Sequence, residues 1–256
     1  MTTRVALVTG AAQGIGQAIA LRLAKDGLDV AVDDIASKAT ELDLLVKQIQ
    51  GLGRRAIALT EDVTQEHGVK RMVEETVTAL GSLDVMVANA GVAPKKVVTI
   101  AEADLSDWDA LLAVNLRGVV MCYKYAAKQM IKQGTGGRII GASSICGLKG
   151  YAGLGDYCMS KAAVRSLTQS SALELKEHNI QVNAYAPGVI NTAMARNDVH
   201  DKELGGPTST TKQILRIPDA KTGDVNDVAS LVSYLASPEA HFITGQTMAV
   251  DGAQSL

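Results

Sequence analysis

Seven short apolar runs alternate along the chain with segments of helical periodicity, and this alternation limits the possible folds most strongly. The runs end in small or polar residues and are VALVTG, DVAVDD, AIALTED, LDVMVANAG, GRIIGASS, QVNAYAPG and QTMAVDG. Between them, apolar residues recur about every 3.6 positions over residues 14–25, 36–50, 65–80, 105–132, 156–176 and 226–236. Such alternation is typical of parallel strands joined by right-handed crossovers. We therefore predict an α/β fold, with a doubly wound parallel sheet of about seven strands and helices on both faces.

The composition supports strands that are buried on both faces. Hydrophobic residues make up 47% of the 256 residues and aromatic residues 3%, so the core must be aliphatic, as a parallel sheet between two helical layers requires. The length suits one domain over residues 1–256, and no repeat or linker interrupts it. Residues 189–225 have weak periodicity, and we predict a substrate lid there rather than a flexible connector.

Charge and the length of the apolar runs exclude several classes of partner. The net charge is −2 and no basic stripe is present, which argues against nucleic acid and anionic membranes. The longest apolar runs have about ten residues, where a membrane span needs about 20. The N-terminal run resembles a first strand rather than a signal peptide, and three widely spaced cysteines favour a reducing compartment, so we predict a cytoplasmic location. Four scattered histidines predict no metal site.

The first apolar run leads directly into a glycine-rich turn and then into a helical segment. Residues 9–16 have the pattern T-G-x-x-x-G-x-G. Glycines let the backbone approach a pyrophosphate, and the following helix offers free N–H groups and the positive end of its dipole. This strand–turn–helix context predicts a dinucleotide site in a Rossmann-type sheet. The residues expected to form it are Gly10, Gln13, Gly14, Ile15 and Gly16.

The end of the second apolar run indicates which dinucleotide binds. It ends in Asp33 and Asp34, and an acidic side chain here accepts hydrogen bonds from the adenosine ribose and repels a 2′-phosphate. We assign this role to Asp34 and expect Asp33 to be a solvated carboxylate at the strand end. Lys38 is the one nearby base that opposes this reasoning. NAD(H) is therefore favoured over NADP(H).

Tyr157 and Lys161 stand four residues apart at the start of a helical segment, so the phenol and the ammonium share one helix face. Free tyrosine titrates near pH 10, and a neighbouring cation lowers its pKa towards the range that proton transfer at neutral pH requires. Ser144 ends the fifth apolar run, where strand ends surround the ligand crevice, so its hydroxyl can polarise a substrate carbonyl. Strand alternation should point Ser143 away from the site.

In combination these motifs resemble the short-chain dehydrogenase/reductase family over nearly the whole chain. The matching motifs are the turn of residues 9–16, the N-A-G of residues 89–91 and the serine, tyrosine and lysine at Ser144, Tyr157 and Lys161. The resemblance implies Asn115 as a fourth catalytic residue, which links Lys161 to solvent through water. It also implies cofactor contacts from Asp62, Val63, Asn89, Ala90, Gly91, Pro187, Gly188, Ile190 and Thr192, besides Tyr157 and Lys161.

The resemblance further implies the chemistry. Tyr157 exchanges a proton with the substrate oxygen, Lys161 lowers the pKa of the tyrosine and binds the nicotinamide ribose, and Ser144 orients the substrate. The nearest subgroup is the acetoin/diacetyl reductases, or butanediol dehydrogenases. We therefore expect a short-chain NAD-dependent alcohol dehydrogenase or carbonyl reductase for a small diketone, hydroxyketone or vicinal diol. Residues 145–149 and the C-terminal DGAQSL differ from the residues that the subgroup has at these positions, so the identity of the substrate stays open.

Two alternatives remain open from the sequence. One is an enzyme for a larger secondary alcohol or ketone of terpenoid or polyketide type, and the other is a catalytically silent NAD-binding redox sensor. The resemblance also implies a homotetramer built on the helices that carry Asn115 and Tyr157. Cys146 and Cys158 flank the predicted site. We expect them to be small buried apolar fillers, with substrate lining or redox sensitivity as the alternative.

Overall fold

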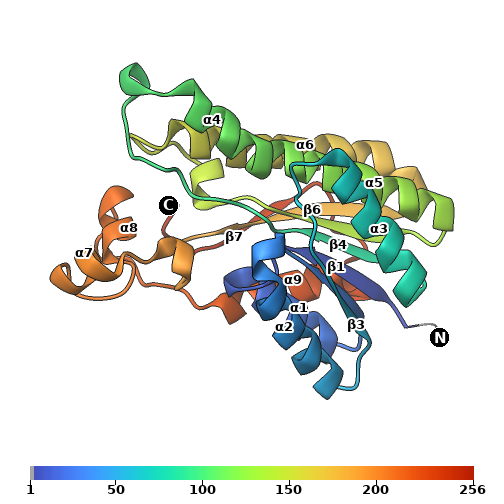
Figure 1. The fold of residues 1–256 in the computed structure, drawn as a ribbon. Helices are drawn as coiled ribbons and strands as arrows, with labels where there is room; N and C mark the ends of the chain where they lie inside the picture. The colour runs from blue at the N-terminus through green and yellow to red at the C-terminus, as the bar shows by residue number, and fades with distance from the viewer. Residues whose placement is uncertain (1–2) are drawn as a thin grey trace.

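In the computed structural model, which describes residues 3–256, seven parallel strands form one sheet between two layers of helices (Figure 1). In spatial order the strands run β3-β2-β1-β4-β5-β6-β7. The order reverses between β1 and β4, and an open α/β sheet binds its ligand at the carboxyl ends of the strands at this point. The predicted doubly wound sheet is thereby confirmed. Its strands are β1 (Val5–Thr9), β2 (Asp29–Asp33), β3 (Ala56–Leu59), β4 (Val85–Ala88), β5 (Gly137–Ala142), β6 (Ile180–Pro187) and β7 (Thr247–Val250).

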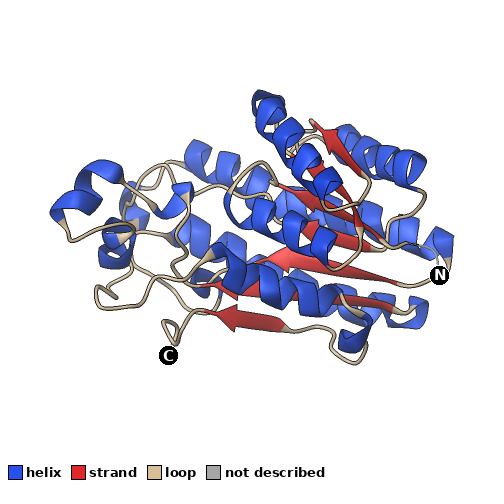
Figure 2. Ribbon diagram, turned by 90° about the horizontal axis from the view of Figure 1, so that it is seen from below, coloured by secondary structure: helices blue, strands red, loops and turns tan. Residues whose placement is uncertain are grey.

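Helices cover both faces of the sheet (Figure 1, Figure 2). One layer contains α1 (Gly14–Lys25), α2 (Ala39–Gly51) and α9 (Val225–Ala236), and the other contains α3 (Glu66–Leu80), α4 (Leu105–Leu112), α5 (Val119–Gln133) and α6 (Gly155–Leu175). In β1, Ala6 and Val8 face the first layer whereas Val5 and Leu7 face the second, and all four are fully buried. This explains why the strands are apolar throughout. None of the helices described is long and apolar enough to span a bilayer.

The helix expected over residues 105–132 contains a π-helical turn. α4 leads into the π turn Ala113–Gly118, and α5 follows directly. Turns of this kind hold an extra residue and occur frequently at functional sites. Asn115 lies within this turn and is fully buried. The apolar period of the sequence predicted a helix here but not the irregular turn.

The predicted lid, residues 189–225, is a lobe that stands beyond the carboxyl ends of the strands (Figure 1). It contains two short helices, α7 (Asp198–Glu203) and α8 (Ser209–Ile214), which weak periodicity did not predict. The two ends of the lobe are joined, because Ile190 forms a parallel bridge with Gly223 and the Gly223 N–H donates to the Val189 carbonyl at 2.9 Å. Gln254 reinforces this junction: its side chain accepts from the Val189 N–H at 2.8 Å and donates to the Lys221 carbonyl at 2.7 Å.

A buried carboxylate organises the interior of the lobe. Asp201 is 3% exposed, and its side-chain oxygens accept the backbone N–H groups of Asn197, Thr208 and Thr210 at 2.9, 2.8 and 2.8 Å. Although burial raises the pKa of Asp201, the hydrogen bonds outweigh it and hold the pKa far below its ordinary value. The lobe therefore has a defined internal structure and two joined ends, and its role as a substrate lid stays a prediction.

Candidate active site

A cavity of about 820 Å³ opens at the carboxyl ends of the central strands. It lies within the range of about 300–1,000 Å³ that is usual for ligand pockets. All but one of the residues predicted to bind cofactor or to act in catalysis line it; the exception is Asn115. The residues that line it are Gly10, Gln13, Gly14, Ile15, Gly16, Asp34, Asp62, Val63, Asn89, Ala90, Gly91, Ser144, Tyr157, Lys161, Pro187, Gly188, Ile190 and Thr192.

The glycine-rich turn has the shape that a diphosphate needs. Gly10 and Gly14 adopt φ values of 63° and 59°, in the left-handed region that other residues avoid. A Cβ at Gly16 would overlap the Gly10 carbonyl oxygen, so only glycine lets α1 begin against the turn. Gln13 precedes α1 without capping it through its side chain. The cradle and the helix N-terminus therefore fit the diphosphate of a dinucleotide.

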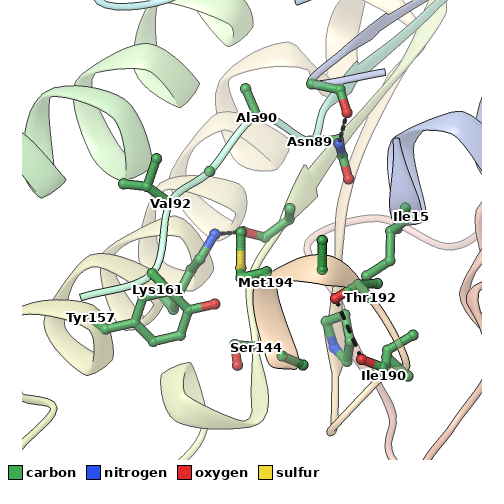
Figure 3. A pocket seen from close by; sticks show the side chains of 18 of the residues that line it. Ile15, Asn89, Ala90, Val92, Ser144, Tyr157, Lys161, Ile190, Thr192 and Met194 are labelled. Carbon is green, nitrogen blue, oxygen red and sulfur yellow. Dashed lines mark hydrogen bonds between the residues drawn. The ribbon is translucent and has the colours of Figure 1, made fainter. Parts of the chain in front are cut away.

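Asn89 fixes the floor of the cavity where β1 and β4 end. Its side-chain amide donates to the carbonyls of Thr9 and Gly10 at 2.9 and 3.0 Å, as Figure 3 shows in part. Its side-chain oxygen accepts the hydroxyl of Tyr185 at 2.8 Å. The N-A-G motif thus ties three strands together beside the glycine-rich turn.

The structure corrects one expectation at the end of β2. Asp33 is fully buried rather than solvated, because β2 continues to this residue between Thr9 of β1 and Leu59 of β3. One of its oxygens accepts the Glu61 N–H at 3.0 Å, and the other lines the cavity region without a hydrogen-bond partner. Asp34, half-buried beside it, accepts the Ala12 N–H at 3.1 Å.

Both carboxylates therefore face the adenosine end of the cavity, together with Glu61 and Asp62. Burial, reinforced by these acidic neighbours, raises the pKa of Asp33 well above its ordinary range, although the hydrogen bond from Glu61 opposes the shift. The unpartnered oxygen of Asp33 offers a ligand a buried hydrogen-bonding group. This end of the cavity is thus strongly acidic.

Tyr157, Ser144 and Lys161 come together at the other end of the cavity (Figure 3). Tyr157 and Lys161 lie on the first turns of α6, and Ser144 follows β5. The Lys161 Nζ lies 5.6 Å from the centroid of the tyrosine ring and donates to the Ala142 carbonyl at 2.9 Å. The Ser143 hydroxyl donates to the Lys161 carbonyl at 2.9 Å, so it braces α6 and is not free to bind substrate.

The electrostatics of this group differ from the sequence expectation in one respect. Burial raises the pKa of Tyr157 above its ordinary value, Cys146 adds to the rise, and a hydrogen bond with Ser144 opposes it. The neighbouring ammonium was expected to lower the pKa, but it lies beside the ring and bonds the Ala142 carbonyl. Burial also lowers the pKa of Lys161 to about 8. Lys161 therefore titrates much closer to neutrality than an exposed lysine.

Asn115 does not line the cavity, but its side chain bonds to Val92, which does. Its side-chain oxygen accepts the Val92 N–H at 2.8 Å and its amide donates to the Val92 carbonyl at 3.0 Å. The amide also reaches the Ser160 hydroxyl at 3.4 Å. Asn115 thus holds the segment after β4 against α6, and the π turn places it there.

Apolar side chains form the rest of the wall around Tyr157 and Ser144. Four of them cluster next to the catalytic hydroxyls and come from the 3₁₀ turn after Ser144, the start of α6 and the lid: Ile145, Leu154, Val189 and Leu215. Sequence reasoning did not assign these residues, because an apolar residue in a loop carries no signal of what it faces. The wall next to the two hydroxyls is therefore largely apolar. Polar side chains from the loop after β4 and from the lobe of residues 189–225 also line the cavity, namely Lys95, Lys96, Arg196, Asn197, Thr210 and Thr211.

The comparisons with known proteins agree with this geometry. Residues 4–203 match the short chain dehydrogenase family. The chain belongs to the short-chain dehydrogenase/reductase family. Among its relatives, a short-chain dehydrogenase/reductase from Armillaria gallica is 47% identical over 97% of this chain and 95% of its own. A 3-oxoacyl-[acyl-carrier-protein] reductase from Staphylococcus aureus is 40% identical over 99% of both.

Solved short-chain dehydrogenase structures share the whole fold. Acetoin dehydrogenase from Salmonella typhimurium has a TM-score of 0.84 and 36% identity over 98% of this chain and 95% of its own. Carveol dehydrogenase from Mycobacterium avium, solved with NAD, has a TM-score of 0.89 and 30% identity over 98% and 97%. A blue fluorescent protein from a metagenomic library, solved with NADPH, has a TM-score of 0.86 and 33% identity over 99% and 98%. This chain is thus an oxidoreductase of a family that binds nicotinamide cofactors.

Proposed function

We propose that this enzyme uses NAD(H) to interconvert a ketone and a secondary alcohol, with Tyr157 as the proton-transfer residue. The observation that carries the proposal is the placement of Tyr157 and Ser144 in the same cavity as the glycine-rich cradle (Figure 3). When bound, the nicotinamide supplies or accepts the hydride. A cavity that joins a diphosphate site to two neighbouring hydroxyls fits this reaction class.

The side chains of this chain perform the proton chemistry. In reduction, the hydroxyls of Ser144 and Tyr157 hydrogen-bond the carbonyl oxygen, and Tyr157 transfers its proton to the oxygen as negative charge develops there. Lys161, with a pKa of about 8, is charged at neutral pH and favours the phenolate that remains. We propose that the Asn115 side chain holds a water molecule, and that this water returns a proton towards Lys161.

The preference for NAD(H) is supported by the adenosine end of the cavity. The cavity-lining residues of 33–35 and 61–64 include four carboxylic acids and no lysine or arginine. Lys38, the base that opposed this preference, pairs with Glu41 at 2.9 Å. Arg71 pairs with Glu61 at 2.6 Å but does not line the cavity. A 2′-phosphate would therefore meet mainly carboxylates. The ratio of kcat/KM for NADH and NADPH measures the preference, and a ratio below one would overturn it.

A small uncharged diketone, hydroxyketone or vicinal diol remains the substrate that we favour. The wall next to Ser144 and Tyr157 is apolar, which suits a compact neutral carbonyl compound at the reacting position. The second candidate is a larger terpenoid or polyketide ketone, favoured by Ile214 and Leu215, which extend the apolar wall onto the lid. Acetoin dehydrogenase and carveol dehydrogenase are each named for one of these classes.

A substrate panel with a tyrosine variant tests the proposal. Diacetyl, acetoin, butanediol and a cyclic terpenoid alcohol are assayed through NADH absorbance at 340 nm. Tyr157→Phe should reduce kcat at least about 100-fold and leave NADH binding, measured by fluorescence titration, nearly unchanged. Tyr123→Phe is the matched control, because Tyr123 is a buried tyrosine that bonds Thr168 instead. Unchanged turnover in Tyr157→Phe would overturn the assignment, and NADH binding without turnover on any ketone would favour the redox sensor.

We also propose that the enzyme is a homotetramer built on the α5 and α6 faces. Large apolar side chains are exposed on these helices, with Val120 40%, Ile131 41% and Leu173 70% exposed. Such side chains in one helical layer are suited to burial between subunits. Sedimentation or size-exclusion measurements at micromolar concentration test this, and the mass of a single chain would contradict it.

A further inference from the structure

Two cysteines lie in the apolar cluster next to the hydroxyls of Ser144 and Tyr157. Cys146 is the second residue after Ser144, in the 3₁₀ turn Ile145–Gly147, and Cys158 follows Tyr157 in the first turn of α6. The turn packs directly on the helix, and both thiols belong to the apolar cluster that surrounds the substrate end. Both are free thiols in this structure.

The two thiols differ in environment. Cys146 is 5% exposed, and the neighbouring Cys158 thiol and burial raise its pKa. Cys158 is half-buried, and the hydrogen bond from Cys146 lowers its pKa to about 7. Its place in the first turn of a 21-residue helix also favours a thiolate, because the positive end of the helix dipole lies there. Cys158 is therefore the accessible nucleophile and Cys146 its protected partner.

We propose that Cys146 and Cys158 form an oxidation site in which a hydroperoxide converts the two thiols into one disulfide beside the active site. The Cys158 thiolate attacks the peroxide, and an S–O bond forms as the O–O bond breaks. The departing oxygen takes up a proton, equivalent to the one that the Cys158 thiol released, and leaves as water or an alcohol. The Cys146 sulfur then attacks the Cys158 sulfur, the S–S bond forms, the S–O bond breaks, and the thiol proton leaves with the oxygen as water. The two sulfurs supply the two electrons that reduce the peroxide.

Closure of this disulfide changes the position of catalytic groups. The Cys146 N–H donates to the Ser144 hydroxyl oxygen at 3.1 Å, and Cys158 adjoins Tyr157 in the chain. An S–S bond of about 2 Å draws the turn and the helix closer than non-bonded sulfurs allow. A displacement of about 1 Å at reacting groups costs about 100-fold in rate. The oxidised enzyme should therefore have at most about a tenth of its reduced activity.

The activity readout rests on the proposed carbonyl reduction, whereas the covalent readout does not. The full-length enzyme is treated with hydrogen peroxide, quenched, and divided between mass spectrometry of the intact chain and the NADH assay. We expect loss of two hydrogens from the intact mass, a peptide that joins Cys146 to Cys158, and loss of activity. Dithiothreitol should reverse all three. A disulfide without measurable reductase activity in any sample would leave the modification site intact and count against the proposed function.

Single-cysteine variants separate this site from general oxidation. Cys158→Ala and Cys146→Ala are each compared with their own untreated activity and should neither lose two hydrogens nor lose activity reversibly. Cys122→Ala is the matched control, because Cys122 is buried in the core and should leave the response as in the parent enzyme. The proposal is overturned if the parent enzyme forms no joined peptide. Reversible inactivation that persists in Cys158→Ala would overturn it equally.

Discussion

Replacing Lys161 with methionine should make the protein more stable at neutral pH while it removes a catalytic group. Lys161 is 4% exposed, and its Nζ has a single hydrogen-bond acceptor in the structure, the Ala142 carbonyl. Burial lowers its pKa from 10.5 to about 8. At about 1.4 kcal/mol for each pH unit, this difference corresponds to a destabilisation of about 3 kcal/mol. Methionine has a similar shape and no charge.

The pH dependence of stability shows whether the Lys161 side chain stabilises or destabilises the folded chain. At pH 7 the amine is protonated in the folded and the unfolded chain, so the full cost of the buried charge is present. Between about pH 8 and 10.5 the folded chain binds fewer protons than the unfolded chain, so the stability of the parent enzyme rises with pH. In the variant the Ala142 carbonyl loses its hydrogen-bond donor, which removes about 1 kcal/mol of the stability gained by eliminating the buried charge. We therefore expect Lys161→Met to be more stable by about 2 kcal/mol at pH 7, and by about 0 near pH 10.

Urea unfolding at pH 7 and near pH 10, without nucleotide and at one protein concentration, measures both differences. Other groups that titrate at alkaline pH act on parent and variant alike, so the difference between the two isolates Lys161. Lys161→Arg is a useful control because it keeps the charge at both pH values. A variant that is less stable at pH 7, or a difference that does not change with pH, would refute the electrostatic reasoning.

Three further predictions concern the cofactor cradle and the lid. Gly16→Ala should abolish nucleotide binding, measured by NADH fluorescence titration, because its Cβ would overlap the Gly10 carbonyl; native affinity would contradict this. Asp33→Ala should weaken NADH binding by about tenfold, as expected when a buried hydrogen-bonding group is lost, and unchanged affinity would show that the unpartnered oxygen binds nothing. Asp201 has a lowered pKa, so it stabilises the lid above about pH 4 and this contribution is lost as the pH falls. Asp201→Asn should raise KM at pH 7 more than it lowers kcat, and limited proteolysis should cut the lobe of residues 189–225 earlier; equal proteolysis of both proteins would exclude this role.

Most of the fold and much of the site could be predicted because the relevant signals are local. Apolar runs and helical periods located the sheet and its layers, and glycines that need a left-handed backbone located the cradle. The burial of Asp33 could not be predicted in the same way, because it depends on two neighbouring strands. The pairing of Cys146 with Cys158 depends on how a loop packs on a helix.

The pKa of Tyr157 shows the same limitation for electrostatics. A spacing of four residues predicts that a lysine shares a helix face with the tyrosine, but not which atom the ammonium approaches. In the structure Lys161 Nζ bonds a backbone carbonyl, and the depth of the phenol determines the direction of the pKa shift. The roles of the predicted residues therefore stay predictions until turnover is measured, although their positions are established.

The π turn at Ala113–Gly118 has a consequence for how insertions and deletions affect this enzyme. Each residue advances an α-helix by about 100° around its axis, so removing one residue from this turn would rotate Asn115 relative to one of the flanking helices. Val92 would lose both of its hydrogen bonds with the Asn115 side chain, one donated by its N–H and one accepted by its carbonyl. Circular dichroism would still report a fully helical segment, yet the loop after β4 would be released from α6. A regular α-helix and the two hydrogen bonds between Asn115 and Val92 are therefore mutually exclusive at this point in the chain.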